Sequence, residues 1–349
     1  MIVIRAGILG FCMGVRRAVE TACRESSKTS VDYETNRDNK TNRDNNTSCA
    51  NKTNRVYTLG PLIHNPRVLE NLINRGIRVL EPVAGVMNDL GSSQARGSYK
   101  EEVKDAAVII RAHGISPAEE RELVRLGARV IDATCPHVKV SQKKARSFVE
   151  MGYLVFLAGE KNHAEITGIR GYADDALKTR MGNQAHYSAE GGAANSGNYP
   201  SCYIVADPDE AGATAAKLAS QNQGAKTALI GQTTISPGEY KAIGEKIKCY
   251  FPDLEIIYTI CGKTKDRQKA LVELSARVDA FVIAGSQDSA NARRLLSIAR
   301  DTGKKAWLVE DAAGIPQEVF AFSVVGLSAG ASTPDETIDE IERALRGEP

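Results

Sequence analysis

Residues 133–165 read ATCPHVKVSQKKARSFVEMGYLVFLAGEKNHAE, and this stretch contains one complete cysteine–helix–strand unit. A cysteine precedes an amphipathic segment with helical periodicity, and a short apolar run with a polar end follows it. A helical period followed by a buried strand is typical of α/β units with parallel sheets. We therefore expect a helix after Cys135, then a strand, then a polar turn at the carboxyl end of that strand.

The same pattern occurs three times along the chain. The other copies open GFCMGV and TICGKT, and each continues through strands and helices in the same order. Cys135 to His163 and Cys261 to Ser289 both span 28 residues. Repeats of this length are whole domains, and three related domains packed around a pseudo-threefold axis bring equivalent strand ends to one centre.

The predicted fold class is α/β, a trefoil of three related α/β domains with small, mostly parallel sheets around a central cluster site. Ligands of such sheets bind at the carboxyl ends of the strands. Low-complexity inserts lengthen the first two domains, and we expect a disordered segment at 30–55 and loops at 84–101 and about 178–200. The predicted domains are residues 1–133, with the N-terminal strand, 134–259 and 260–349.

Composition excludes several classes of protein. The 349 residues carry a net charge of only +2, which argues against nucleic acid as the main ligand. No apolar run approaches the roughly 18 residues that a transmembrane helix needs. Seven cysteines, an odd number, without an export signal indicate a reducing cytoplasm and argue against a disulfide framework.

Three cysteines, Cys12, Cys135 and Cys261, occupy equivalent positions of the repeat, each at or just before a predicted helix. A helix N-terminus favours thiolates, which are the ligands of iron–sulfur clusters and of zinc. Three thiolates leave a fourth ligand position open, which suggests catalysis at the metal. The cysteines outside the repeat have the ordinary interpretation of small apolar residues: Cys23, Cys49, Cys202 and Cys249.

Polar side chains gather where the predicted strands end, three of them histidines. Histidines, hydroxyls and Gly-rich turns suit a compact anion such as a diphosphate. Glu165 is the one carboxylate beside such a histidine, so it is either a proton donor with a raised pKa or a group that orients His163. The set comprises His64, His113, His163, Thr233, Ser289, Asn291 and Ser332.

At these residues the chain resembles the 4-hydroxy-3-methylbut-2-enyl diphosphate reductase (LytB) family, the last enzyme of the non-mevalonate isoprenoid pathway. Nine motifs occur in the family's order, from about residue 10 to about residue 335: GFCMGV, IHNPRV, RAHGIS, DATCPHV, NHAEITG, GQTTIS, TIC, GSQDSAN and AGASTPD. Single motifs are weakly specific, but nine in order are strongly specific. The resemblance covers nearly all of the chain outside the inserts.

The resemblance implies reductive dehydroxylation of (E)-4-hydroxy-3-methylbut-2-enyl diphosphate to isopentenyl and dimethylallyl diphosphate. It assigns a [4Fe-4S] cluster with one open iron to Cys12, Cys135 and Cys261, and the proton to Glu165, with Thr233 beside it. Gln232, Thr234 and Thr264 match secondary pocket positions. Electrons are expected from a separate donor such as ferredoxin or flavodoxin. The resemblance assigns the diphosphate contacts to His64, His113, His163, Ser289, Asn291 and Ser332.

The chain departs from the family pattern at two positions. Ala290 replaces a common serine, so one hydroxyl contact to phosphate is missing or is replaced by water. Gly262 replaces an aromatic residue of some members. Neither position is a predicted ligand or the predicted acid, so the implied activity survives both departures.

Two other functions stay open on the residues alone. A zinc hydrolase could use the same three cysteines, and iron–sulfur absorption near ~400 nm would exclude it. A non-enzymatic phosphate-binding protein with a structural metal is the other, although the open ligand position and Glu165 argue against it. Anaerobic reduction of the substrate with an artificial electron donor separates it from the reductase.

Overall fold

The computed structural model describes residues 1–35, 55–81, 100–187, 202–222 and 224–348. The chain folds into two compact units. The larger comprises Met1–Cys12, Ile115–Pro117 and Pro136–Pro349, and the smaller comprises Met13–Gly114 and Ala118–Cys135. Cys12 and Cys135 each end a segment at a boundary between these units.

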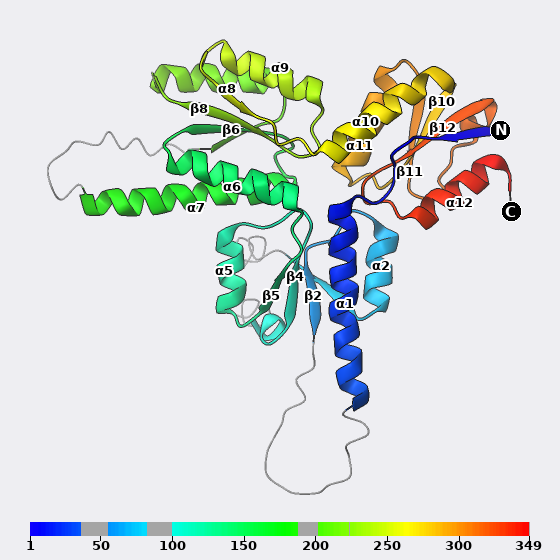
Figure 1. Ribbon diagram of the computed structural model, residues 1–349, viewed down its shortest axis with the longest axis horizontal. Helices are drawn as coiled ribbons and strands as arrows, with labels where there is room; N and C mark the ends of the chain where they lie inside the picture. The colour runs from blue at the N-terminus through cyan, green and yellow to red at the C-terminus, as the bar shows by residue number, and fades with distance from the viewer. Residues whose placement is uncertain (36–54, 82–99, 188–201, 223, 349) are drawn as a thin grey trace, which may run out of the picture. The chain divides into compact units, whose positions relative to one another are not determined.

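The described residues form three four-stranded sheets, and every strand pairs parallel to its neighbours (Figure 1). The sheet of the smaller unit has the order β3-β2-β4-β5, and those of the larger unit have the orders β7-β6-β8-β9 and β1-β12-β10-β11. Their strands are β2 (Val56–Leu59), β3 (Ile77–Leu80), β4 (Ala107–Ile110), β5 (Arg129–Asp132), β6 (Leu154–Ala158), β7 (Cys202–Val205), β8 (Thr227–Gly231), β9 (Glu255–Ile257), β10 (Ala280–Ala284), β11 (Lys305–Val309), β12 (Val324–Ala329) and β1 (Ile2–Arg5).

One strand order therefore serves all three sheets, with the second, first, third and fourth strands of each repeat side by side. The fourth strand of the last repeat is β1, where Ile2 pairs with Val324 and Arg5 with Leu327. The prediction that the N-terminal strand belongs to the first domain is wrong, because β1 completes the C-terminal sheet. Each fourth strand, β1, β5 or β9, leads directly into one of the three predicted cysteine ligands.

The sheet around β6 is covered on both faces, as parallel sheets require. Alternate residues of β6 point to opposite faces, so Phe156 packs with the helices α8 and α9, whereas Val155 packs with α6 and α7. In Figure 1, α6 and α7 lie side by side along this sheet. The helices are α6 (Pro136–Glu150), α7 (Ala164–Tyr187), α8 (Pro208–Gln221) and α9 (Pro237–Lys248).

The C-terminal sheet is built in the same way. Phe281 of β10 packs with α10 (Gly262–Leu274) and α11 (Ala290–Asp301), and Val282 packs on the opposite face with α12 (Asp335–Arg346). Between β10 and α10 the chain forms a short 3-10 helix, η1 (Ser275–Arg277), and a second, η2 (Gln317–Ala321), precedes β12.

The smaller unit holds α1 (Met13–Thr35), α2 (Pro66–Asn74) and α5 (Pro117–Arg125), the last with its first residue in the larger unit. Glu25 of α1 forms ion pairs with Lys28 and with Arg129 of β5, and these cations hold the pKa of Glu25 below its usual range against the opposing effect of burial. Ser26 donates a hydrogen bond to the carbonyl of Arg75, at the end of α2.

These elements confirm the predicted α/β class with small parallel sheets. The loop predictions were wrong at their edges, because α1 runs to Thr35, α7 runs to Tyr187, and residues 100–103 are helical. The rest of the three predicted inserts lies outside the described residues. Among the described residues, no helix combines the length and apolar character that a membrane span needs.

Candidate functional site

Each sheet has a topological switch point between its first and third strands, which lie side by side. The chain leaves the first strand toward one edge of the sheet and the third strand toward the other edge, and ligands of α/β sheets bind at this point, outside the carboxyl ends. The predicted anion-binding and proton-donor residues follow these strands in all three sheets: His64 and His113 after β2 and β4, His163, Glu165 and Thr233 after β6 and β8, and Ser289, Asn291 and Ser332 after β10 and β12.

The three predicted cysteine ligands each stand one residue before a helix. Met13 begins α1, Pro136 begins α6, and Gly262 begins α10. Cys261 has the extended backbone of a helix cap, although its side chain caps no N–H group. None of the three cysteines is in a disulfide bond. The expected position of the thiols at helix N-termini is therefore confirmed.

Main-chain hydrogen bonds tie two of these cysteines to strand ends of the larger unit. The N–H of Cys12 donates to the carbonyl of Ala331, after β12, at 3.2 Å. The N–H of Cys261 donates to the carbonyl of Thr233, after β8, at 3.0 Å. In the smaller unit, Cys135 lies against Gly14, where a Cβ atom at position 14 would lie 2.7 Å from the Cys135 sulfur.

Glu165 lies in the first turn of α7 and is 1% exposed. Both oxygens of its carboxylate accept hydrogen bonds from Thr233: Oε1 from the backbone N–H at 2.6 Å and Oε2 from the hydroxyl at 2.9 Å. Burial raises the pKa of Glu165 to about 7, while the two hydrogen bonds from Thr233 act to lower it. The carboxyl therefore exchanges its proton near neutral pH, as a general acid requires.

His163 is held by the backbone of Glu165, whose N–H donates to Nδ1 of the imidazole at 3.2 Å. An Nδ1 that accepts leaves the proton of the neutral ring on Nε2, which is then a donor for an anion. It is the amide of Glu165 that bonds this nitrogen, while both carboxylate oxygens bond Thr233. This division of contacts favours the interpretation of Glu165 as a proton donor.

The smaller unit brings two of the predicted anion ligands together. The rings of His64 and His113 lie 4.9 Å apart between centroids. Arg111 also follows β4. Its guanidinium lies against Gly60, and a Cβ atom on that glycine would lie 2.7 Å from Nη1. Burial lowers the pKa of Arg111, while Glu119 and Glu81 act to raise it. Sequence reasoning gave Arg111 no role, although it lies in the quoted RAHGIS motif.

The third sheet supplies Ser289 and Asn291 at the start of α11. Ser289 caps the helix, since its Oγ accepts from the N–H of Ala292 at 3.3 Å. Asn291 is 5% exposed, and neither its Oδ1 nor its Nδ2 has a hydrogen-bond partner among the described residues. A buried amide without partners is costly, so a polar ligand at this position would satisfy it. Ser332, after β12, is buried as well.

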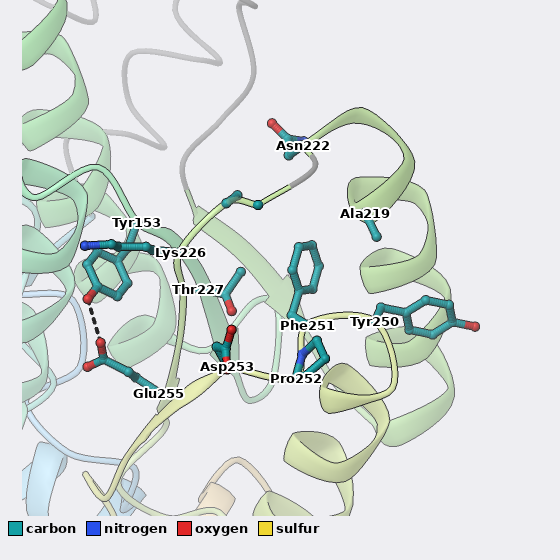
Figure 2. A pocket seen from close by; sticks show the side chains of 12 residues that line it. Tyr153, Ala219, Asn222, Lys226, Thr227, Tyr250, Phe251, Pro252, Asp253 and Glu255 are labelled. Atoms are coloured by element: carbon teal, nitrogen blue, oxygen red, sulfur yellow. Dashed lines mark hydrogen bonds between the residues drawn. The ribbon is translucent and has the colours of Figure 1, made fainter.

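A pocket of about 690 Å³ lies elsewhere on the larger unit. It is lined by Thr227 and Glu255, the first residues of β8 and β9, so it opens at the amino ends of those strands. Figure 2 shows Lys226 and the hydrogen bond from the Tyr153 hydroxyl to Glu255 on one side, and Tyr250 and Phe251 on the other. The predicted site residues follow the carboxyl ends of the strands, so this pocket is not part of the candidate active site.

Arg267 is a residue of this region that sequence reasoning missed. It is 2% exposed, on the buried face of α10. Burial lowers the pKa of Arg267, while the nearby Cys12 and Cys261 act to raise it. The sequence could have indicated Arg267 through its position on the helix. Residues 264, 267, 268, 271 and 274 share one face at helical spacing, and Arg267 is the charged residue on that otherwise uncharged face.

Comparison with known proteins assigns the family. The family model described as "LytB protein" matches residues 43–346. The chain belongs to the LytB protein family. Full-length relatives extend the LytB match over the N-terminal segment that holds Cys12. The chain is 39% identical to 4-hydroxy-3-methylbut-2-enyl diphosphate reductase of Treponema denticola, with 99% of each chain covered.

Further LytB relatives agree in name and coverage. The reductase of Treponema pallidum is 40% identical, with 99% of this chain and 83% of the relative covered. The reductase of Aquifex aeolicus is 32% identical, with 99% and 96% covered.

Solved structures of LytB-like reductases have the same fold. The E-1-hydroxy-2-methyl-but-2-enyl-4-diphosphate reductase of Plasmodium falciparum superposes with a TM-score of 0.72 at 22% identity, over 98% of this chain and 87% of that one. A second solved structure is that of (E)-4-hydroxy-3-methyl-but-2-enyl diphosphate reductase, the terminal enzyme of the non-mevalonate pathway. It gives a TM-score of 0.58 at 29% identity, over 99% and 100% of the two chains.

Proposed function

We propose that this chain is a 4-hydroxy-3-methylbut-2-enyl diphosphate reductase. It removes the hydroxyl group of (E)-4-hydroxy-3-methylbut-2-enyl diphosphate and forms isopentenyl and dimethylallyl diphosphate, the last step of the non-mevalonate pathway. The observation that carries this proposal is the buried Glu165 carboxyl, held by Thr233, which also binds the backbone of Cys261. Its relatives of that name align with nearly the whole chain.

The residues fit a [4Fe-4S] cluster bound by Cys12, Cys135 and Cys261. These cysteines supply thiolates, the ligands that such clusters prefer, and the chain has no fourth cysteine at an equivalent repeat position. The buried guanidinium of Arg267 has two nitrogen atoms without a partner among the described residues, and the nearby Cys12 and Cys261 act to raise its pKa against the lowering effect of burial. A buried cation of this kind calls for an anion, and a thiolate-bound cluster is one.

A bound cluster supplies electrons one at a time and, at the iron without a protein ligand, Lewis acidity. The overall reaction consumes two electrons and two protons, breaks the allylic carbon–oxygen bond, forms one carbon–hydrogen bond and releases water. A separate ferredoxin or flavodoxin is the proposed electron donor. The thiols must stay reduced to serve as ligands, which favours the cytoplasm.

Glu165 delivers the proton that lets the hydroxyl group leave as water. A pKa of about 7 keeps a large fraction of this carboxyl protonated at neutral pH. The Thr233 N–H and hydroxyl fix both oxygens, so the carboxyl does not have to be oriented during the reaction. The hydroxyl of Thr233 also lies beside the path of that proton.

The predicted anion-binding residues bind the diphosphate group of the substrate. Asn291 offers an amide with unsatisfied donor and acceptor atoms, and His163 offers Nε2 as a donor. Contacts remote from the reacting carbon orient the substrate and contribute to catalysis through binding energy. The proposed contacts are His64, His113, His163, Ser289, Asn291 and Ser332.

The test is anaerobic turnover of (E)-4-hydroxy-3-methylbut-2-enyl diphosphate with a reduced viologen dye as electron donor. We expect both isopentenyl and dimethylallyl diphosphate as products. Glu165→Gln keeps its iron and sulfide and loses roughly 100- to 10,000-fold in turnover, the usual contribution of a general acid. An iron-loaded protein that leaves the substrate unchanged would overturn the proposal, and full activity of Glu165→Gln would remove Glu165 from the proton path.

A further inference from the structure

The buried face of α10 contains a charge where its neighbours are apolar or neutral. Thr264, Gln268, Leu271 and Leu274 share this face with Arg267. A guanidinium stays charged in proteins, and a buried charge is stable only when other groups compensate it. The contacts of Arg267 therefore show which groups in this part of the protein compensate its buried charge.

The contacts found within the described residues satisfy only part of this guanidinium. Nη2 donates to the carbonyl of Gly10 at 2.7 Å. Nε and Nη1 are buried and have no hydrogen-bond partner among the described residues. No carboxylate of the described residues forms an ion pair with Arg267 either. Within the described residues, the positive charge and two donor groups thus lack an anion.

Two of the proposed cluster ligands lie near this charge. Gly10, which accepts from Arg267, precedes Cys12 by two residues. Long side chains of a helix lean toward its N-terminus, and the N-terminus of α10 is capped by Cys261. Burial lowers the pKa of Arg267, while both cysteines lie near enough to act to raise it. All four residues belong to the larger unit.

We propose that Arg267 is the counter-cation of the cluster bound by Cys12 and Cys261, and that its charge raises the reduction potential of this cluster. One-electron reduction adds a negative charge to a thiolate-bound cluster, and a fixed cation in a poorly solvated position stabilises the more negative state. Arg267 acts through the cluster, so it is a positioning residue. This inference rests on the proposed function, since it requires a cluster at these cysteines.

The experiment compares the reduction potentials of anaerobically purified holoproteins in redox titrations followed by electron paramagnetic resonance. Arg267→Met removes the charge at similar length, and Arg267→Lys keeps it. Lys269→Met is the matched control, because it removes a charge of the same sign from the same helix at an exposed position. Iron and sulfide contents are measured for each protein.

We expect Arg267→Met to shift the potential to more negative values. At a fixed potential, the ratio of reduced to oxidised cluster should fall at least tenfold, about 59 mV for a one-electron couple. Arg267→Lys should recover most of this shift, and Lys269→Met should leave the potential unchanged. A fully loaded Arg267→Met protein with the wild-type potential would overturn the inference.

If Arg267→Met retains too little cluster for a redox titration, the iron and sulfide contents of Arg267→Lys test the proposal instead. Retention of iron and sulfide by Arg267→Lys then supports the role of the charge, whereas loss of the cluster from both variants overturns it. A wild-type protein that binds neither iron nor sulfide contradicts the proposed function itself. The two failures are therefore distinguishable.

Discussion

The backbone N–H of Cys261 donates a 3.0 Å hydrogen bond to the carbonyl oxygen of Thr233. On its other side, the N–H and hydroxyl of Thr233 bind the carboxylate of Glu165. One residue just after β8 thus connects the proposed proton donor with a proposed cluster ligand. A change at Thr233 is expected to affect proton delivery first, because its side chain contacts only the proton donor in this chain of hydrogen bonds.

The raised pKa of Glu165 predicts how stability depends on pH. Between its ordinary pKa of 4.5 and about 7, the folded protein keeps a proton that the unfolded chain has lost. The free energy of unfolding therefore falls as pH rises through this window, by a total on the order of 3 kcal/mol, and levels off above it. Urea unfolding of the wild type and of Glu165→Gln at pH 4.5, 6 and 8 measures this contribution. A difference between the two proteins that does not change with pH contradicts the raised pKa.

Thr233→Val should shift the pH profile of turnover. The substitution removes the hydroxyl bond to Oε2 and leaves the N–H bond to Oε1, so the pKa of Glu165 rises further. The loss of activity on the basic side then occurs at higher pH, and a buried oxygen without a donor costs about 1–3 kcal/mol of stability. Thr179→Val, the same substitution at an exposed position of α7, is the control and should keep the wild-type profile. Identical profiles for all three proteins would exclude Thr233 from the control of this proton.

Gly14→Ala should reduce cluster content. The new Cβ atom would lie 2.7 Å from the sulfur of Cys135, and this sulfur has to move. Gly262→Ala is a matched control beside Cys261, since a Cβ atom there meets nothing within 4 Å. Iron and sulfide analysis should find a loss in Gly14→Ala only. Equal contents in both variants would mean that the position of the Cys135 sulfur does not matter for binding the cluster.

Asn291→Leu should separate stability from binding. The amide of Asn291 is buried without partners in the described residues, so its removal should leave stability unchanged or increase it by about 1 kcal/mol. KM for the diphosphate substrate should rise. Asn65 is equally buried, at 5% exposed, but it caps α2, so Asn65→Ala should cost about 1 kcal/mol. If Asn291→Leu loses stability as Asn65→Ala does, Asn291 is a structural residue.

The fold could be predicted because its local signals repeat. The runs that contain β6 and β10 are short and apolar and are each followed by glycine, and the helices before them have amphipathic periodicity, so three similar sheets followed from pattern alone. The partner of β1 could not be predicted, because parallel strands give no local sign of which strand they pair with. The extension of α7 to Tyr187 was missed because residues 178–200 as a whole are rich in Gly, Ser, Asn and Ala, while Lys178, Arg180 and Met181 at the start of that stretch favour a helix.

The residues of the candidate site could be predicted from the sequence. The contacts that these residues make with one another could be predicted less well. Glu165 and Thr233 are 68 residues apart, and only the pairing of β6 with β8 brings the ends of these strands together. Arg267 was missed because a charged residue on an amphipathic helix is usually exposed. Its burial depends on packing between α10 and the N-terminal segment, which no local pattern contains.

Three cysteines from three repeats are proposed to bind one iron–sulfur cluster. The most direct test of this proposal is iron and sulfide analysis of anaerobically purified protein, in the wild type and in Cys12→Ala, Cys135→Ala and Cys261→Ala, with Cys249→Ala as control. We predict about four irons and four sulfides per chain in the wild type and the control, as a [4Fe-4S] cluster requires, and a large loss in each of the other three variants. Full iron and sulfide in any one of those three variants would contradict the proposal.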